Sequence, residues 1–74
     1  MQTILITGVN GFLGSSLAQT LMKRGDQVIG IDLADESSVD INKYIQSDLA
    51  DHMSFTRIVT ALEEYDSIDG LINN

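Results

Sequence analysis

The first half of the chain carries two patterns of apolar residues separated by a glycine-rich turn. Residues 3–7, TILIT, form a β-branched apolar run that suits a strand buried on both faces. Leu13, Leu17 and Leu21 then recur at helical spacing. Residues 23–25, KRG, place cations in the last turn of this helix and a glycine just after it. The pattern predicts a strand over residues 3–7 and a helix over residues 11–24.

The middle of the chain has shorter apolar runs. Residues 28–31 predict a second strand, which ends at Asp32. Residues 33–43 are polar and acidic, and we interpret them as a loop or a short helix, because this connection is near the minimum length for a crossover. Residues 44–46 are a weaker strand candidate.

The last third predicts one more helix and one more strand. Phe55, Ile58, Val59 and Leu62 recur at i, i+3, i+4 and i+7, with Asp51 as a candidate N-cap. Residues 69–73 supply a final strand. Strands that alternate with helices in this order are typical of parallel crossovers. The sequence therefore predicts an α/β fold, the N-terminal half of a Rossmann-type doubly wound parallel sheet with about four strands and two main helices.

Composition narrows the classes of function. The chain has 74 residues and a hydrophobic fraction of 43%, which predicts one small globular domain rather than disorder. Its formal net charge is −7, and four basic residues cannot form the cationic face that a nucleic acid or an anionic membrane requires. No apolar run reaches the length of a membrane span, and the N-terminus does not resemble a signal peptide. The absence of cysteine excludes disulfides and thiolate metal sites, and we expect a cytoplasmic protein.

A glycine occurs at every third position of the turn between the first strand and the first helix, in residues 8–14, GVNGFLG. The first glycine of such a loop permits a sharp turn, the second lets the backbone approach a phosphate, and the third permits close helix packing. The free N–H groups and the dipole of the helix then face a pyrophosphate. A glycine-rich turn without a ligand is the alternative. A Walker A loop is excluded, because Ser15 rather than a lysine follows Gly14.

Asp32 follows Gly14 by eighteen residues and ends the second predicted strand. An acid at this position accepts hydrogen bonds from both hydroxyls of the adenosine ribose. An aspartate at a strand end is often only a turn former, but together with the glycine loop it favours a dinucleotide site. Its carboxylate would repel a 2′-phosphate, and residues 33–36, LADE, contain no Lys or Arg. The sequence therefore predicts NAD(H) rather than NADP(H).

With these residues identified, the chain resembles the short-chain dehydrogenase/reductase superfamily over nearly its whole length. Residues 7–14, TGVNGFLG, are similar to its TGxxGxxG loop in the form of the nucleotide-sugar epimerases and dehydratases, and Asp32 matches the ribose-binding acid of NAD-using members. Asp48 and Leu49 resemble the pair whose Asp lies near the adenine ring, although a strand-end cap is an equal interpretation of Asp48. Residues 68–74, IDGLINN, resemble the run into the NNAG motif, whose first Asn, here Asn73, supports the central sheet.

The resemblance leaves the branch of the superfamily open. The glycine spacing resembles the epimerase/dehydratase branch, whereas the NN ending resembles the smaller reductases, whose usual spacing is GxxxGxG. The superfamily's reaction implies a Tyr, a Lys four residues later and a Ser. Tyr44 and Tyr65 are each followed four residues later by an aspartate, so neither matches this pair. We expect no catalytic residue within the chain, and no metal site, because His52 is solitary.

Three functions are compatible with the sequence. The first is the NAD(H)-binding segment of a short-chain oxidoreductase that transfers a hydride between the nicotinamide and a carbonyl or hydroxyl carbon of a small-molecule substrate. The alternatives are a nucleotide-sugar epimerase or dehydratase that uses NAD transiently, and a non-catalytic dinucleotide sensor. The candidate cofactor-binding residues are Gly8, Asn10, Gly11, Phe12, Leu13, Gly14, Asp32, Leu33, Asp48, Leu49 and Asn73.

The chain stops directly after its last predicted strand. We therefore expect residues 1–74 to be a partial NAD-binding Rossmann domain, incomplete at its C-terminus, inactive and poorly stable by itself. The strand that contains Leu71 and Ile72 would lie at an uncovered edge of the sheet. This predicts a homo-oligomer or self-association through that edge, or a partner segment that completes the sheet.

Overall fold

Six elements follow one another in the computed structural model, which describes residues 1–48 and 50–74. Each strand and the first helix begin and end within one residue of the predicted bounds. Residues 33–42 contain neither helix nor strand, so the connection predicted as a loop or a short helix is a loop. The elements are β1 (Thr3–Thr7), α1 (Phe12–Lys23), β2 (Gln27–Asp32), β3 (Lys43–Gln46), α2 (His52–Leu62) and β4 (Gly70–Asn73).

The four strands form one parallel sheet in the order β3-β2-β1-β4. From the central β1 the chain proceeds outward through β2 to β3 and then returns to the other side of β1 with β4. At mid-sheet, Leu5 of β1 lies opposite Ile29 of β2 and Leu71 of β4. This is the predicted N-terminal half of a Rossmann-type sheet. The reversal of strand order occurs beside β1, and doubly wound sheets bind ligands outside the carboxyl ends of the strands at this point.

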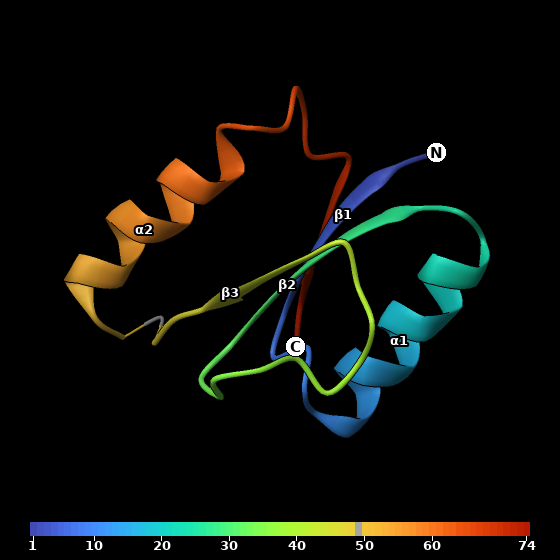
Figure 1. Cartoon of the computed structure of the whole chain (residues 1–74), viewed down its shortest axis with the longest axis horizontal. Helices are drawn as coiled ribbons and strands as arrows, with labels where there is room; N and C mark the ends of the chain where they lie inside the picture. The colour runs from blue at the N-terminus through green and yellow to red at the C-terminus, as the bar shows by residue number, and fades with distance from the viewer. Residues whose placement is uncertain (49) are drawn as a thin grey trace.

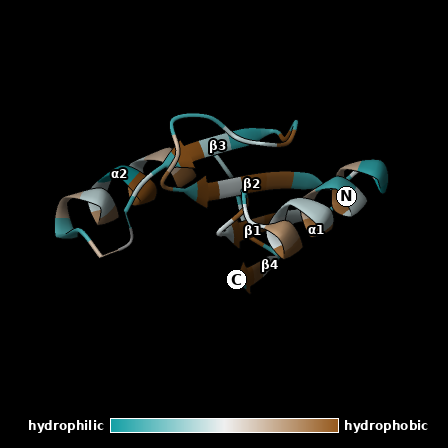
Figure 2. Cartoon of the chain, turned by 90° about the horizontal axis from the view of Figure 1, so that it is seen from below, coloured by the Kyte–Doolittle hydropathy of each residue, from teal (hydrophilic) through white to brown (hydrophobic). Residues whose placement is uncertain are grey.

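The two helices lie on opposite faces of the sheet (Figure 1). Alternate strand residues therefore face different cores: Ile4, Ile6 and Val28 pack with α1, whereas Ile29, Ile31 and Ile45 pack with α2. Figure 2 shows hydrophobic residues concentrated in β1, β2 and β4, whereas β3 and the two helices mix hydrophobic and polar residues. Burial on both faces explains why the two central strands, β1 and β2, are mostly apolar along their length rather than alternating. The loop of residues 33–42 lies on the α1 side, where Val39 and Ile41 join that core.

The C-terminus of α1 ends in a Schellman motif. Gly25 has a φ of 86°, which favours glycine, and its amide donates to the Met22 carbonyl at 3.1 Å. The next amide, that of Asp26, donates to the Leu21 carbonyl at 3.0 Å. Both bonds satisfy carbonyls at the end of the helix. The prediction that Gly25 occupies the C′ position is confirmed.

The buried face of α1 differs from the predicted leucine stripe. Leu13 and Leu17 are 62% and 41% exposed, whereas Gly14 and Ala18 are buried and Leu21 is partly buried. The buried stripe is offset by one residue because α1 approaches the sheet through its smallest side chains. The periodicity identified the helix correctly but not its inward face.

The predicted face of α2 is also only partly correct. Asp51 is the N-cap, since its side chain accepts a hydrogen bond from the Met53 amide at 3.0 Å. Ile58 is buried and Leu62 is partly buried in the core against β2 and β3, but Phe55 and Val59 are exposed. Because α2 packs beside β3 at one end of a four-stranded sheet, only a narrow stripe of the helix is covered (Figure 1).

The other end of the sheet is formed by β4, which pairs with β1 on one side. Ile72 packs into the α1-side core, whereas Leu71 on the opposite face is 63% exposed.

In the described part of the chain, neither helix is long and apolar enough to cross a membrane.

Candidate functional site

A cleft of about 260 Å³ lies at the carboxyl ends of the strands, where doubly wound sheets bind their ligands. Five of the predicted cofactor-binding residues line it: Gly8, Asp32, Leu33, Asp48 and Asn73. The predicted residue Leu49 lies outside the described residues. The other lining residues are Thr7, Ile31, Ser47 and Asn74.

The glycine loop brings the start of α1 against the end of β1. Gly8 turns the chain off the strand with a φ of 69°, and its amide donates to the Ile31 carbonyl at 2.8 Å. A Cβ on Gly14 would overlap the Gly8 carbonyl oxygen and lie 2.9 Å from Nδ2 of Asn74. The third glycine is therefore required for close packing, as the pattern predicts.

The N-terminus of α1 is open. Its N-cap is Gly11, so no side chain of the cap accepts a hydrogen bond from the first turn, and the first turn contains no acidic residue. The side chains of Phe12 and Leu13 are mostly exposed to solvent. These two residues can therefore contribute to an anion site only through their backbone N–H groups. Unpaired amides and the positive end of the dipole favour an anion here.

Asp32 is held by two backbone amides at the carboxyl end of β2. Its Oδ2 accepts from the Asn10 amide at 2.8 Å, and its Oδ1 accepts from the Leu33 amide at 2.8 Å. A carboxylate has about four lone-pair positions, so both oxygens retain accepting capacity. The two hydrogen bonds fix the orientation of this half-buried carboxylate, which can accept hydrogen bonds from two hydroxyls on adjacent carbons.

The side chain of Asn10 turns away from the cleft. Its Nδ2 donates to the Glu36 carbonyl at 3.1 Å and to Oη of Tyr44 at 3.3 Å, and its Oδ1 accepts from the Ser38 amide at 2.7 Å. The structure thus places a residue predicted to bind cofactor in contact with the loop that follows β2. Only its backbone amide, which donates to Asp32, remains at the carboxyl end of β2.

The ends of β1 and β4 are fastened by polar side chains. The Thr7 hydroxyl donates to Oδ1 of Asn73 at 2.9 Å and accepts from the Asn74 amide at 3.2 Å. Nδ2 of Asn74 donates to the Gly8 carbonyl at 3.2 Å. Asn73 and Asn74 therefore support the sheet and the glycine loop, which is the structural role that the resemblance implies for the first Asn.

Asp48 and Ser47 follow β3 at the floor of the cleft. Oδ1 of Asp48 accepts from the Ala50 amide at 2.9 Å, so this residue caps the turn while it lines the cleft. Ser47 is only 5% exposed, and among the described residues its Oγ has no hydrogen-bond partner. Nothing in the sequence distinguishes this serine, because only the tertiary structure shows that its hydroxyl is buried in the cleft and unpaired.

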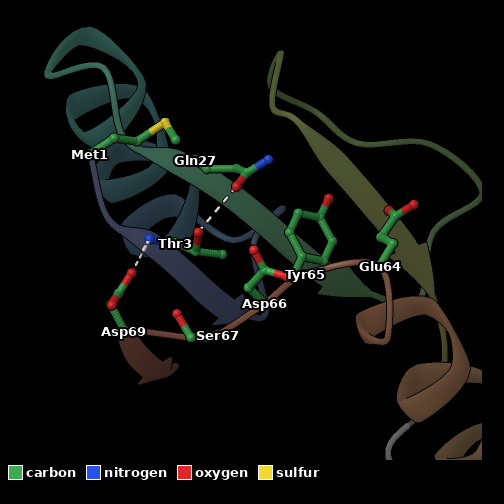
Figure 3. Close-up of a pocket in the computed structure, with 8 residues that line it drawn as sticks. All are labelled: Met1, Thr3, Gln27, Glu64, Tyr65, Asp66, Ser67 and Asp69. Atoms are coloured by element: carbon green, nitrogen blue, oxygen red, sulfur yellow. Dashed lines mark hydrogen bonds between the residues drawn. The ribbon is translucent and has the colours of Figure 1, made fainter.

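A larger hollow of about 650 Å³ lies at the amino ends of the strands, beside the start of β1 (Figure 3). Thr3 bonds there to Gln27 and Asp69, and the lining carboxylates are Glu64, Asp66 and Asp69. Three carboxylates disfavour a phosphate, and no predicted site residue lies there. Within the described residues, no three His, Cys, Asp or Glu side chains are arranged so that they could hold a metal ion.

Comparison with known proteins identifies similar chains. Residues 4–73 match the family described as the NAD dependent epimerase/dehydratase family. The chain is 40% identical over 67 residues to Protein CapI of Staphylococcus aureus, a match that covers 88% of this chain and 20% of that protein. It is 36% identical over 81 residues to the reductase FabG of Buchnera aphidicola, covering 99% of this chain and 33% of that protein. The chain thus spans 20% and 33% of these two relatives.

Two solved structures share the fold over nearly the whole chain. A short chain dehydrogenase from Leptospira borgpetersenii with bound NAD+ superimposes with a TM-score of 0.84 at 32% identity, covering 97% of this chain and 30% of that one. The Bordetella bronchiseptica enzyme WbmH in complex with NAD+ gives a TM-score of 0.74 at 28% identity, covering 100% and 25%. The similar proteins thus include one named a reductase, and the matching family is named for epimerases and dehydratases.

Proposed function

Because this chain belongs to the NAD dependent epimerase/dehydratase family, we propose that residues 1–74 are part of a dinucleotide-binding domain and bind NAD(H) for an oxidoreductase. One observation carries the proposal: the open N-terminus of α1 and the carboxylate of Asp32 meet at the same edge of the sheet, joined through the Asn10 amide. An anion-binding helix end beside a hydroxyl-binding carboxylate matches the pyrophosphate and ribose of a dinucleotide.

The glycine loop would bind the pyrophosphate. Gly8, Gly11 and Gly14 let α1 approach the strand ends, and the N–H groups of its first turn supply the hydrogen bonds. Phe12 and Leu13 contribute through their backbone, since both side chains are exposed. The loop needs no basic side chain for this role, because the partial positive charge comes from the helix itself.

The other residues of the cleft would bind the adenosine. Asp32 accepts hydrogen bonds from the ribose hydroxyls, with Leu33 beside it, and Asp48, which lines the same cleft, binds toward the base. The Ser47 hydroxyl, which has no hydrogen-bond partner among the described residues, fits this assignment, since a buried polar group without a partner costs about 1–3 kcal/mol unless a ligand satisfies it. The Leptospira relative, whose structure contains NAD+, supports the same cofactor.

The chemistry that NAD supplies is hydride transfer, and the work of this chain is to bind and orient it. Its residues fix the adenosine and pyrophosphate, which lie remote from the reacting carbon. The reaction proposed for the whole protein is hydride transfer to or from a carbonyl or hydroxyl carbon of a small molecule. The carboxylate of Asp32 disfavours a 2′-phosphate, so NAD(H) is the proposed cofactor rather than NADP(H).

Calorimetric titration tests the proposal. NAD and ADP-ribose should bind with similar affinity, because the proposed contacts involve the adenosine and the pyrophosphate that the two ligands share. Nicotinamide mononucleotide, which lacks the adenosine, should bind at least about tenfold more weakly, the equivalent of one or two lost hydrogen bonds to a charged group. No saturable binding of NAD or ADP-ribose would contradict the function.

A further inference from the structure

One side chain of the glycine loop holds the segment that follows Asp32. The amide of Asn10 bonds to residues 36 and 38 through a carbonyl and an amide of their backbone, at 3.1 and 2.7 Å. Both atoms of the side-chain amide are thus engaged, on a segment that contains neither helix nor strand. Asn10 fixes this segment to the loop rather than pointing toward a phosphate.

Tyr44 completes the attachment from β3. Its hydroxyl donates to the Ala34 carbonyl at 2.6 Å and accepts from Nδ2 of Asn10 at 3.3 Å. Burial raises the pKa of Tyr44, and the charge of Asp32 raises it further, so the phenol stays protonated as a donor. The two side chains therefore tie three parts of the fold together: the glycine loop, the segment and β3.

The segment held in this way is acidic and adjoins the ribose-binding carboxylate. Asp35 and Glu36 follow Asp32 by three and four residues. Oδ1 of Asp35 accepts from Nε2 of Gln46 at 3.1 Å, which gives the segment a further contact with β3. Repulsion between a carboxylate and a phosphate falls with their separation, so its size depends on how firmly the segment is held.

We propose that Asn10 and Tyr44 are positioning residues for cofactor selectivity, which hold the acidic segment of residues 34–36 beside Asp32 and so disfavour a 2′-phosphorylated dinucleotide. This inference rests on the proposed binding of NAD(H). It gives Asn10 a role through its side chain that differs from the direct contact predicted from the sequence. Asp35 and Glu36 are exposed, so without the attachment this segment is free to move away from Asp32 and its carboxylates repel the phosphate less.

The test compares Asn10→Ala and Tyr44→Phe with a matched control, Asn42→Ala. Asn42 also uses a side-chain oxygen to accept from a backbone amide, that of Val28 at 2.7 Å, but it lies at the far end of the same loop. Calorimetry gives the dissociation constants of NADP and NAD for each variant. The dissociation constant of NADP divided by that of NAD should fall about threefold in the first two variants, the size expected for exposed charge interactions. The same ratio should stay unchanged in Asn42→Ala.

A purely structural role would lower stability in all three variants and leave this ratio unchanged. An unchanged ratio in Tyr44→Phe, which keeps the ring and removes only the hydroxyl, overturns the proposal even if Asn10→Ala does not fold. A wild-type chain that binds no NAD contradicts the proposed function itself, whereas NAD binding with an unchanged ratio contradicts only the selectivity role.

Hydrogen exchange of the Ser38 amide provides a second measurement that needs no cofactor. Oδ1 of Asn10 is the acceptor of this amide, so Asn10→Ala should accelerate its exchange at least about tenfold. Exchange in Asn42→Ala should match the wild type at Ser38. Equal protection of Ser38 in the wild type and in Asn10→Ala shows that the segment is held by other contacts and overturns the proposal.

Discussion

The backbone amide of Asn10 donates to Oδ2 of Asp32 at 2.8 Å, across 22 positions of the sequence. This bond joins the glycine loop, which follows β1, to the end of β2. The carboxylate is therefore oriented before any ligand binds. A prearranged acceptor lowers the entropy lost on binding, because the side chain has no rotamers left to lose.

Asp32→Ala should weaken NAD binding about tenfold or more, because it removes the proposed acceptor for the ribose hydroxyls. NADP binding should weaken less or strengthen, since repulsion of the 2′-phosphate falls. Calorimetric titration with both dinucleotides measures the two effects. Asp40→Ala, which loses the same charge at an exposed loop position, is the control. Equal NAD affinity in Asp32→Ala and the wild type would show that Asp32 does not contact the cofactor.

Ser47→Ala should change stability and affinity in opposite directions. Removal of a buried hydroxyl that has no hydrogen-bond partner in residues 1–48 and 50–74 leaves the free chain equally stable or more stable by about 1 kcal/mol. NAD affinity should fall about threefold to tenfold, the value of one lost hydrogen bond. Ser54→Ala, a buried serine of α2 outside the cleft, should leave the affinity unchanged. A Ser47→Ala chain that binds NAD like the wild type shows that the hydroxyl does not contact the cofactor.

Gly14→Ala should both destabilise the chain and prevent NAD binding. The added Cβ overlaps the Gly8 carbonyl oxygen, and overpacking of this kind costs about 1–3 kcal/mol. In a domain of this size the melting temperature falls by about 4–8 °C per kcal/mol. Gly25→Ala is the control, because Gly25 has a φ of 86° and no atom within 4 Å of the added Cβ. It should lower the melting temperature through backbone strain and leave NAD affinity intact. Parallel loss of affinity in both variants would argue against a specific role of Gly14.

The ion pair between Lys43 and Glu64, at 2.6 Å, makes stability depend on pH. The hydrogen bond from Lys43 lowers the pKa of Glu64, and the same bond raises the pKa of Lys43. The contribution of Glu64 is present above its unfolded pKa and is lost as the pH falls through its lowered folded pKa. The contribution of Lys43 is present below its unfolded pKa and is lost as the pH rises through its raised folded value.

Glu64→Gln should therefore be less stable than the wild type near neutral pH, and the two should converge in strong acid and strong alkali. Urea denaturation across the pH range gives this difference in the free energy of unfolding. Glu63→Gln, at the neighbouring residue, is the control, because Glu63 takes no part in the ion pairs that the described residues form. A difference between wild type and Glu64→Gln that is constant across the pH range would exclude the ion pair as its source.

Leu71→Lys should reduce self-association. Leu71 is exposed on β4, whose outer backbone has no partner strand within the described sheet, and a charge on an edge strand opposes pairing with another chain. Sedimentation should show dimers or larger species for the wild type and a shift to monomer for the variant. Met53→Lys, at an exposed apolar position of α2, should leave the association unchanged. A monomeric wild type would contradict the prediction.

The sequence by itself determined the elements and their order. A β-branched apolar run, a glycine in each third position and a cap at Asp51 depend on neighbours close along the chain, so local chemistry is sufficient to predict them. The place of Asp32 at the carboxyl end of β2 could be predicted in the same way, because the apolar run before it marks where the strand ends. The family resemblance, which rests on the same motifs, agrees with the family match over residues 4–73.

The tertiary structure alone decided which atoms meet across long stretches of sequence. The inward face of α1 is set by the close approach of Gly14 to Gly8 rather than by its leucines, and the side chain of Asn10 is directed by a loop more than 20 residues away. Ser47 became a candidate only because its hydroxyl is buried and has no hydrogen-bond partner in the described part of the chain. Periodicity records hydrophobicity along one element, whereas these features depend on steric contact and hydrogen bonding between elements. Such contacts exist only once the sheet has formed.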